Sequence, residues 1–231
     1  MLQCRLLSLI GLLTIGRAVS AQEVRAVAGN VVIVQAAGAS PRQLTNSGHD
    51  SDPVLSPDGR LVAFVRTDSS RQIEVGVGPV PATDIWVIRP VGGRLRRVVS
   101  AHASDDLRKV RAGVGSLAFS RDGHTLYFIS LAWVVVGALH AVDLPSGRER
   151  FVCDANSVEI VRAGRYAGKL LVTQHRYYER GGSYDGVFLV DVNGQQLRTI
   201  GDPDAADYQA RLRAVLEAPA PARRRVAHPS N

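Results

Sequence analysis

The sequence is poor in the residues that build disulfide frameworks. It has two cysteines, Cys4 and Cys153, in 231 residues. Cys4 lies in a stretch that we expect to be removed, and a single remaining cysteine cannot form an internal disulfide. Cys153 lies in a predicted strand with no adjacent base, so we expect a small buried apolar residue rather than a reactive thiol.

Lysine is also scarce. All but two of the 28 basic residues are arginines, and the exceptions are Lys109 and Lys169. The net charge is +7, but two arginines lie in the N-terminal stretch and three in a C-terminal tail, which leaves +2 on the body of the chain. The remaining arginines are scattered, whereas a nucleic-acid surface needs a basic stripe. We therefore expect no nucleic-acid partner.

Long hydrophobic runs are missing. The apolar stretch at residues 6–15 is too short for a bilayer, which needs about 20 residues. Arg5 precedes it and Val19-Ser20-Ala21 supplies small residues after it, a pattern typical of a secretory signal peptide. We predict a signal peptide over residues 1–21 and a mature start at Gln22. The protein would then be periplasmic or secreted and not transmembrane; a signal anchor is the alternative.

Recognised catalytic motifs are absent as well. The sequence has no G-x-S-x-G, no H-E-x-x-H and no P-loop lysine motif. No serine is marked as a nucleophile, and His140 lies mid-strand, where a packed histidine is expected. One histidine with two carboxylates near residue 50 is not a recognised metal-ligand spacing. The sequence predicts no metal and no cofactor, and it leaves open whether the protein is an enzyme.

What the sequence does contain is a strand–turn–strand motif at residues 50–66, DSDPVLSPDGRLVAFVR. Pro57 presets the backbone for a tight turn, Asp58 can hydrogen-bond its own backbone, and Gly59 accepts a positive φ. Residues 61–65 form a β-rich apolar run typical of a strand buried on both faces. Asp58 is therefore expected to form the turn rather than to act as an acid.

The motif recurs, which indicates a repeat architecture. Ser120-Arg121-Asp122-Gly123 is a second copy, and a weaker third unit covers residues 157–200. Each unit reads as four antiparallel strands, the blade of a β-propeller. We predict an all-β propeller over residues 22–201 with three full blades and an N-terminal partial blade. The partial blade has two outer strands, to which residues 23–28 would add a third, and the ring is small or incomplete.

The chain resembles the TolB-type propeller family, periplasmic relatives of WD repeats. The residues that carry the resemblance are Arg42-Gln43-Leu44-Thr45, Asp50 with Pro53, Ser56-Pro57-Asp58-Gly59-Arg60, Ala63-Phe64, Asp84-Ile85-Trp86-Val87 and Gly92-Gly93. The second unit has Arg121 where the motif has proline. We expect the separate N-terminal α/β domain of that family to be missing, because about ten residues separate the leader from the first strong strand.

The C-terminal region reads as a helix followed by a tail. Tyr208, Leu212, Val215 and Leu216 form an apolar stripe at helical spacing within residues 202–218. We expect this helix to pack on the propeller and to cover an open edge, and self-association is the other way to complete the fold. Residues 219–231, rich in proline, alanine and arginine, are predicted to be a disordered basic tail.

Loop length predicts where binding occurs. The turns between the first and second strands of a unit, and between the third and fourth, are tight. The segments at residues 46–52, 67–83, 100–115 and 174–185 are long and should emerge on one face. Loops on a rigid scaffold commonly carry binding. The candidate binding residues on that face are His49, Asp50, Asp52, Asp105, Asp106, Tyr177, Tyr178, Glu179, Arg180 and Tyr184. For Asp50, a structural role that bridges backbone is the alternative, and for His49 a solvated loop.

Two functions fit these features. The first is an exported, non-catalytic propeller that binds a protein or cell-envelope partner through its long loops. The resemblance implies that this partner is a peptidoglycan-associated outer-membrane lipoprotein or another Tol-type component. The alternative is a propeller enzyme, a lactonase- or cyclotransferase-like hydrolase or lyase, with an active site at the pore.

Overall fold

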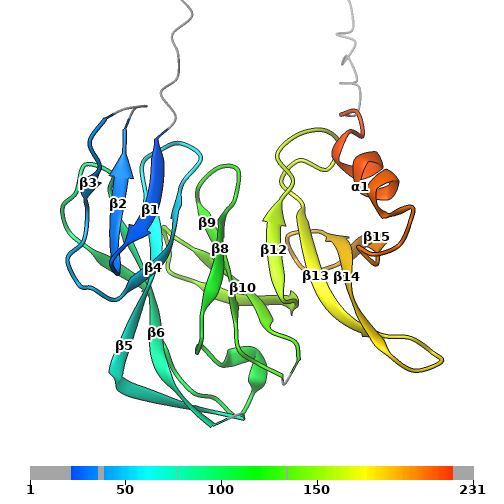
Figure 1. Ribbon diagram of the computed structural model, residues 1–231, viewed down its shortest axis with the longest axis horizontal. Coiled ribbons are helices and arrows are strands. Elements are labelled where there is room, and N and C mark those ends of the chain that lie inside the picture. Colours follow the sequence, from blue (N-terminus) through cyan, green and yellow to red (C-terminus); the bar gives the residue numbers. More distant parts are fainter. Residues whose placement is uncertain (1–21, 36–38, 77, 134, 221–231) are drawn as a thin grey trace, which may run out of the picture.

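The computed structural model describes residues 22–35, 39–76, 78–133 and 135–220. The expected signal peptide and residues 221–231 of the expected tail lie outside the described residues. The described part is built from antiparallel strands in four separate sheets, followed by one helix, as predicted (Figure 1). Within it, no helix is long and apolar enough to cross a bilayer.

The strands follow one another in chain order within each sheet. The first sheet contains β1 (Glu23–Val27), β2 (Asn30–Val34) and β3 (Arg42–Gln43). The second contains β4 (Asp50–Leu55), β5 (Val62–Val75), β6 (Gly78–Ile88) and β7 (Arg96–Val99). The third contains β8 (Gly115–Phe119), β9 (Thr125–Ser130), β10 (Ala138–Asp143) and β11 (Glu149–Asp154). The fourth contains β12 (Ser157–Ile160), β13 (Leu170–Tyr177), β14 (Ser183–Val190) and β15 (Gln196–Gly201). The prediction of three full blades and one partial blade is confirmed, and residues 23–27 supply the third strand of the partial blade.

The two copies of the repeated turn have the same hydrogen bonds. Ser56 Oγ donates to Asp58 Oδ1 at 2.6 Å and accepts from the Leu61 amide at 2.9 Å. In the second copy, Ser120 Oγ donates to Asp122 Oδ1 at 2.6 Å and accepts from the Thr125 amide at 2.9 Å. These bonds hold both carboxylates in the turn and keep their pKa values below the usual range. Both aspartates are therefore turn formers, as the motif predicts.

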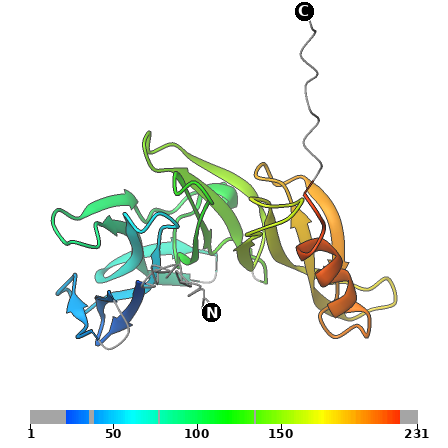
Figure 2. The same cartoon turned by 90° about the horizontal axis from the view of Figure 1, so that it is seen from above.

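The sheets pack face to face and form an open arc rather than a closed ring. Val31 of the first sheet packs on Val62 and Phe64 of the second. Ala63 and Val65 of the second sheet pack with Leu126 and Phe128 of the third, and a further cluster joins the third and fourth sheets. Figure 2 shows the first sheet and the C-terminal helix at the two ends of this arc, apart from each other.

The C-terminal helix α1 (Tyr208–Leu216) covers the free face of the last sheet. Val215 is buried against Leu171, Leu189 and Ile200, whose side chains point away from the third sheet. Tyr208 and Leu212 flank this contact, whereas Leu216 is 41% exposed. The helix therefore occupies the face that would meet another blade in a closed propeller.

The expectation of an irregular loop over residues 67–83 is wrong. Residues 67–75 and 78–83 extend β5 and β6 into a long ribbon, interrupted by an irregularity between Asp68 and Gln72. Ile73 and Ala82 of the ribbon are buried against Ala101 and Ala112. Proline and glycine suggested a loop, but a strand with a free edge tolerates proline, and apolar burial holds the ribbon in place.

Replacing Val215 tests the role of α1 as a cover. We expect Val215→Asp to lower the free energy of unfolding by about 3 kcal/mol, because it places an unpaired carboxylate in an apolar contact. Urea denaturation measures the change. The matched control is Leu216→Asp, on the exposed side of the same helix turn, which should cost less than about 1 kcal/mol. Equal losses in the two variants would show that the helix does not cover the sheet.

Candidate functional site

The long segments emerge along one edge of the arc, the lower edge in Figure 1. This edge, named here the long-loop edge, carries the tip of the β5–β6 ribbon, the 3₁₀ turn at Leu107–Lys109 and the tip of the β13–β14 hairpin. The ribbon and the segment around the 3₁₀ turn pack on each other through Ile73 and Val110. The β13–β14 tip lies at the other end of the arc. The predicted binding residues are therefore divided among separate places.

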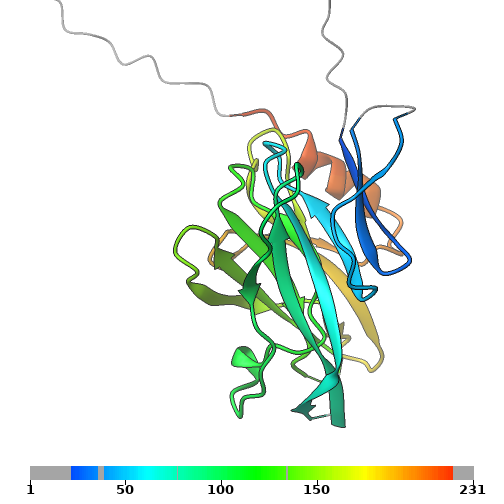
Figure 3. The same ribbon diagram turned by 90° about the vertical axis from the view of Figure 1, so that its left-hand side faces the viewer.

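A row of arginines and carboxylates lies on the face of the second sheet that points toward the first. Arg66 donates to Asp50 through Nε at 2.6 Å and Nη2 at 2.9 Å. Asp84 accepts from Arg71 Nη2 at 2.7 Å and Arg97 Nη1 at 3.2 Å. In Figure 3 the short first sheet lies over only the upper part of the second sheet, so β1 and β2 do not extend over the lower part.

Trp86 lies between two of these arginines. The Arg66 guanidinium is 5.3 Å from the Trp86 ring centroid and the Arg97 guanidinium is 5.9 Å away, both within cation–π range. With His49 these side chains line a pocket of about 550 Å³. Asp68 also lines the pocket, with its Oδ2 3.9 Å from Arg71 Nε. The three arginines therefore face three carboxylates, Asp50, Asp68 and Asp84, and the cluster is charge-balanced.

Asp50 is the most buried of the predicted binding residues. Its residue is 2% exposed, and β4–β5 pairing places it directly opposite Arg66. Burial alone would raise the pKa of Asp50, but hydrogen bonds from Arg66, Thr45 and Ser47 outweigh burial and lower it. Its carboxylate is turned inward and occupied by Arg66, so it supports the pocket rather than facing solvent.

The other acidic candidates are exposed. Asp52 lies in the irregularity between Ser51 and Val54, with φ of 49°. Asp106 caps the 3₁₀ turn, accepting from the Arg108 amide at 3.1 Å, and its neighbour Asp105 is exposed beside it. Among the described residues, no group of three or more His, Cys, Asp or Glu side chains is arranged to hold a metal ion.

Two of the three tyrosine candidates come together, and the register of β13 and β14 places Tyr177 on the opposite face of the hairpin from Tyr184. Tyr178 and Tyr184 stack with ring centroids 4.7 Å apart, and Tyr178 Oη donates to Asp202 Oδ2 at 2.6 Å. That hydrogen bond raises the pKa of Tyr178. Tyr177 contacts His175 edge to face at 5.1 Å and is 72% exposed. Glu179 and Arg180 occupy the turn, which the Tyr178 amide closes on the Gly182 carbonyl at 3.0 Å.

Sequence reasoning missed a buried polar contact. Ser130 Oγ lies 2.9 Å from His140 Nε2, and Arg111 Nη1 lies 3.3 Å from the same nitrogen. Ser130 and His140 are 0% exposed, so substrate cannot reach this pair. Burial, together with the Arg111 and His102 charges, lowers the pKa of His140 to about 3. Strand register brings the residues together, and no sequence signal marks that register.

Cys153 also lies in the core. It is 8% exposed, and burial with the neighbouring Asp154 charge raises its pKa to about 12. Since the thiolate is the reactive form, the thiol is inert at neutral pH. The expectation of a small buried apolar residue is confirmed.

Solved structures identify the fold. TolB from Acinetobacter baumannii matches with a TM-score of 0.50 and 17% identity, over 73% of this chain and 37% of that one. The β-propeller domain of the Trilobed protease from Pyrococcus furiosus, described as having an open velcro topology, matches with a TM-score of 0.51 and 16% identity, over 74% and 47%. The chain has the fold of a TolB-like β-propeller. At these identities the similarity concerns the fold alone.

Enzymes share this fold. An oligogalacturonate lyase, solved in complex with manganese, matches with a TM-score of 0.50 and 15% identity, over 77% of this chain and 43% of the lyase. The chain spans less than half the length of each of these three structures. No protein-family model matches the sequence, and no curated protein matches it.

Replacing Asp50 tests whether its carboxylate supports the fold. We expect Asp50→Asn to lower the free energy of unfolding at pH 7 by about 2–4 kcal/mol, because Arg66 loses its partner. Asp50 has a lowered pKa when folded, so its stabilisation is present above about pH 4 and is lost as the pH falls through the folded pKa. The difference in the free energy of unfolding between Asp50→Asn and the parent protein should therefore become smaller at acidic pH. Asp52→Asn, at an exposed position, is the control. If the difference between Asp50→Asn and the parent protein stays the same at low pH, the Asp50 carboxylate does not have this role.

His140 should make stability depend on pH. Its folded pKa of about 3 lies below the unfolded value of about 6.5, so the unfolded state binds more protons between these values. Stability should fall by about 2 kcal/mol as the pH drops from about 7.5 to about 5. His140→Gln should flatten this slope in urea denaturation, and exposed His124→Gln should not. An unchanged slope in His140→Gln would contradict the assignment.

Proposed function

We propose that this protein is an exported, non-catalytic propeller that binds a protein of the cell envelope through its long-loop edge. The observation that carries the proposal is the tyrosine group at the tip of the β13–β14 hairpin, with exposed Tyr177 on one face and the stacked pair Tyr178 and Tyr184 on the other. Tyr177 is 72% exposed and Tyr178 is 48% exposed. Tyrosine supplies large contact area at low entropic cost and is common among the residues that dominate binding energy.

The hairpin is held rigid, which favours binding. Eight consecutive residue pairs link β13 and β14, from Leu170 opposite Val190 to Tyr177 opposite Ser183. Tyr178 is fixed by its ring stack on Tyr184 and its hydrogen bond to Asp202. A side chain that is already ordered loses little freedom when a partner covers it. We propose that the partner protein covers the exposed ring of Tyr177 and that this contact contributes most to binding.

Polar and charged side chains near the tyrosines could form the polar rim of a protein interface. His175 Nδ1 lies 3.0 Å from Asp185 Oδ1, and Arg176 Nη1 lies 3.3 Å from Asp154 Oδ2. Glu179 and Arg180 are exposed in the turn. His175 and Asp185 lie on the same face of the hairpin as Tyr177, and an aromatic side chain bordered by polar and charged residues is the usual anatomy of a protein interface.

An enzymatic role has less support. The described residues place Ser130 and His140 in contact, but both are sealed from solvent. Within the same part of the chain, the acidic candidates join no metal-binding group of three. The resemblance to the TolB family favours an envelope lipoprotein as the partner, and the exported location belongs to the same proposal.

Site-directed photo-crosslinking tests the proposed surface. We expect a photoreactive phenylalanine analogue at Tyr177 to capture one envelope protein, and the same analogue at Val91, exposed on the opposite edge, to capture none. Tyr177→Ala should weaken binding of the captured protein about 10- to 30-fold. Equal capture from both positions, or full affinity of Tyr177→Ala, would remove the tyrosine group from the interface.

A further inference from the structure

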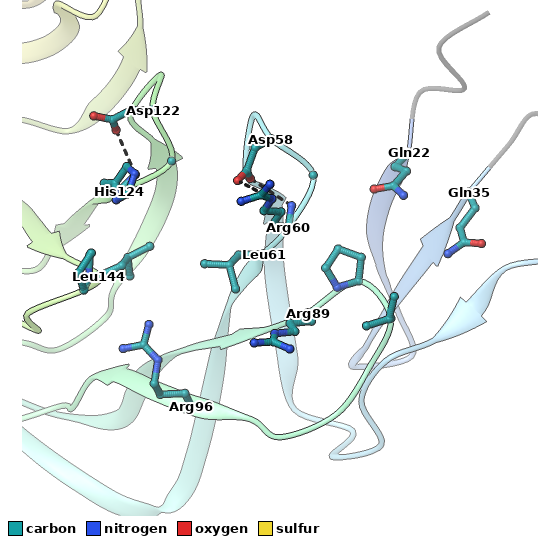
Figure 4. A pocket seen from close by; sticks show the side chains of 15 residues that line it. Gln22, Gln35, Asp58, Arg60, Leu61, Arg89, Arg96, Asp122, His124 and Leu144 are labelled. Carbon is teal, nitrogen blue, oxygen red and sulfur yellow. Dashed lines mark hydrogen bonds and ion pairs between the residues drawn. The ribbon is translucent and has the colours of Figure 1, made fainter. Parts of the chain in front are cut away.

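A second pocket lies at the edge opposite the long loops. It measures about 630 Å³, within the range of small-molecule sites (Figure 4). Tight turns of the second and third sheets form its walls together with residues that flank β1 and β2, and loop length did not indicate a site at this edge. The first sheet contributes Gln22 and Gln35, the second contributes residues 58–61, 89–91 and 96, and the third contributes residues 122–124, 144 and 145.

Two arginines extend into this pocket from the β6–β7 hairpin, Arg89 and Arg96 (Figure 4). The turn that carries Arg89 is closed by the Gly92 amide, which donates to the Arg89 carbonyl at 2.8 Å. The Arg42 guanidinium donates to the Pro90 carbonyl and ties the same turn to the first sheet. Arg96 lies on β7 opposite Val87, on the side that faces the third sheet. Both guanidinium groups are thus attached to ordered backbone.

These two arginines differ from those beside Trp86. Arg66, Arg71 and Arg97 each have a carboxylate partner, whereas Arg89 and Arg96 have none within the described ranges of the chain. The pocket does contain two carboxylates, Asp58 and Asp122, but each is bound by its own turn. Arg60 is also present, with its Nε 3.6 Å from Asp58 Oδ2.

The wall between the arginines is apolar. Leu61 lies above Arg89 in Figure 4. The other apolar residues of the lining are Pro90, Val91, Leu144 and Pro145, and Val91 is 78% exposed. An arginine pair recognises carboxylate and phosphate oxygens through paired N–H donors. The apolar wall would receive a carbon skeleton.

We propose that this pocket binds a small organic anion. Its carboxylate or phosphate group is held by Arg89 and Arg96, and its apolar body lies against Leu61 and Val91. This site lies on the edge opposite Tyr177, so it does not depend on the proposed partner surface.

A titration followed by amide NMR tests the site with two defined probes, phenyl phosphate and 3-phenylpropionate. At least one of them should shift the amides of Gly92, Gly123 and Leu144, and the preferred probe tells whether the site takes a phosphate or a carboxylate. Inorganic phosphate, which lacks the apolar body, should bind at least tenfold more weakly than phenyl phosphate.

Three variants test whether the probes bind at this pocket. Arg89→Gln with Arg96→Gln should weaken probe binding at least tenfold, and Val91→Asp should do the same by placing a negative charge at the mouth. Val91 is exposed, so this second variant leaves the fold intact. Arg162→Gln with Arg213→Gln, which removes an equal charge from the fourth sheet and helix α1, should leave the affinity unchanged. The proposal is overturned if neither probe shifts the pocket amides, or if the Arg89 and Arg96 double variant binds as tightly as the parent protein.

Discussion

The packing of sheet on sheet governs this molecule. Each full blade has apolar side chains on both faces, so each needs a neighbour on both sides. In a closed ring the neighbours are other blades. In this open arc, each end has one face without a neighbouring blade. At the C-terminal end, α1 covers the fourth sheet through Val215. At the N-terminal end, the outer face of the first sheet carries polar residues such as Arg25 and Gln43. A polar outer face is the usual way in which a repeat array ends in water.

The short first sheet has a second effect. Because β1 and β2 have five residues each, they cover Val62, Phe64 and Ile88 but not the lower half of the second sheet. Charged residues occupy the uncovered half. Asp50, Arg66 and Asp84 lie opposite one another across β4, β5 and β6, so one register produces the centre of the row. Arg97 joins it from β7 and Arg71 from the irregularity in β5. The row stabilises the exposed half of the sheet and gives the Trp86 pocket its balanced charge.

Local signals in the sequence predicted the fold well and the site less well. The repeated turn could be predicted because Ser56, Asp58 and Gly59 act within a few residues of one another. The ribbon over residues 67–83 could not, because Pro79 and Pro81 suggested a loop and burial against Ala101 decided otherwise. Contacts such as Ser130 with His140 depend on strand register, which no short motif encodes. The pocket around Arg89 is formed by residues from three sheets, and the packing of the sheets in the arc brings these residues together.

The open arc also determines how the structure can come apart. In a closed ring, detaching any blade breaks two interfaces. In this chain, detaching the fourth sheet breaks its single interface with the third sheet, and α1 leaves together with it. The middle sheets are each held on two sides. Resistance to local opening should therefore be graded along the chain, lowest at the ends, and the tyrosine hairpin belongs to the sheet that can detach as a unit.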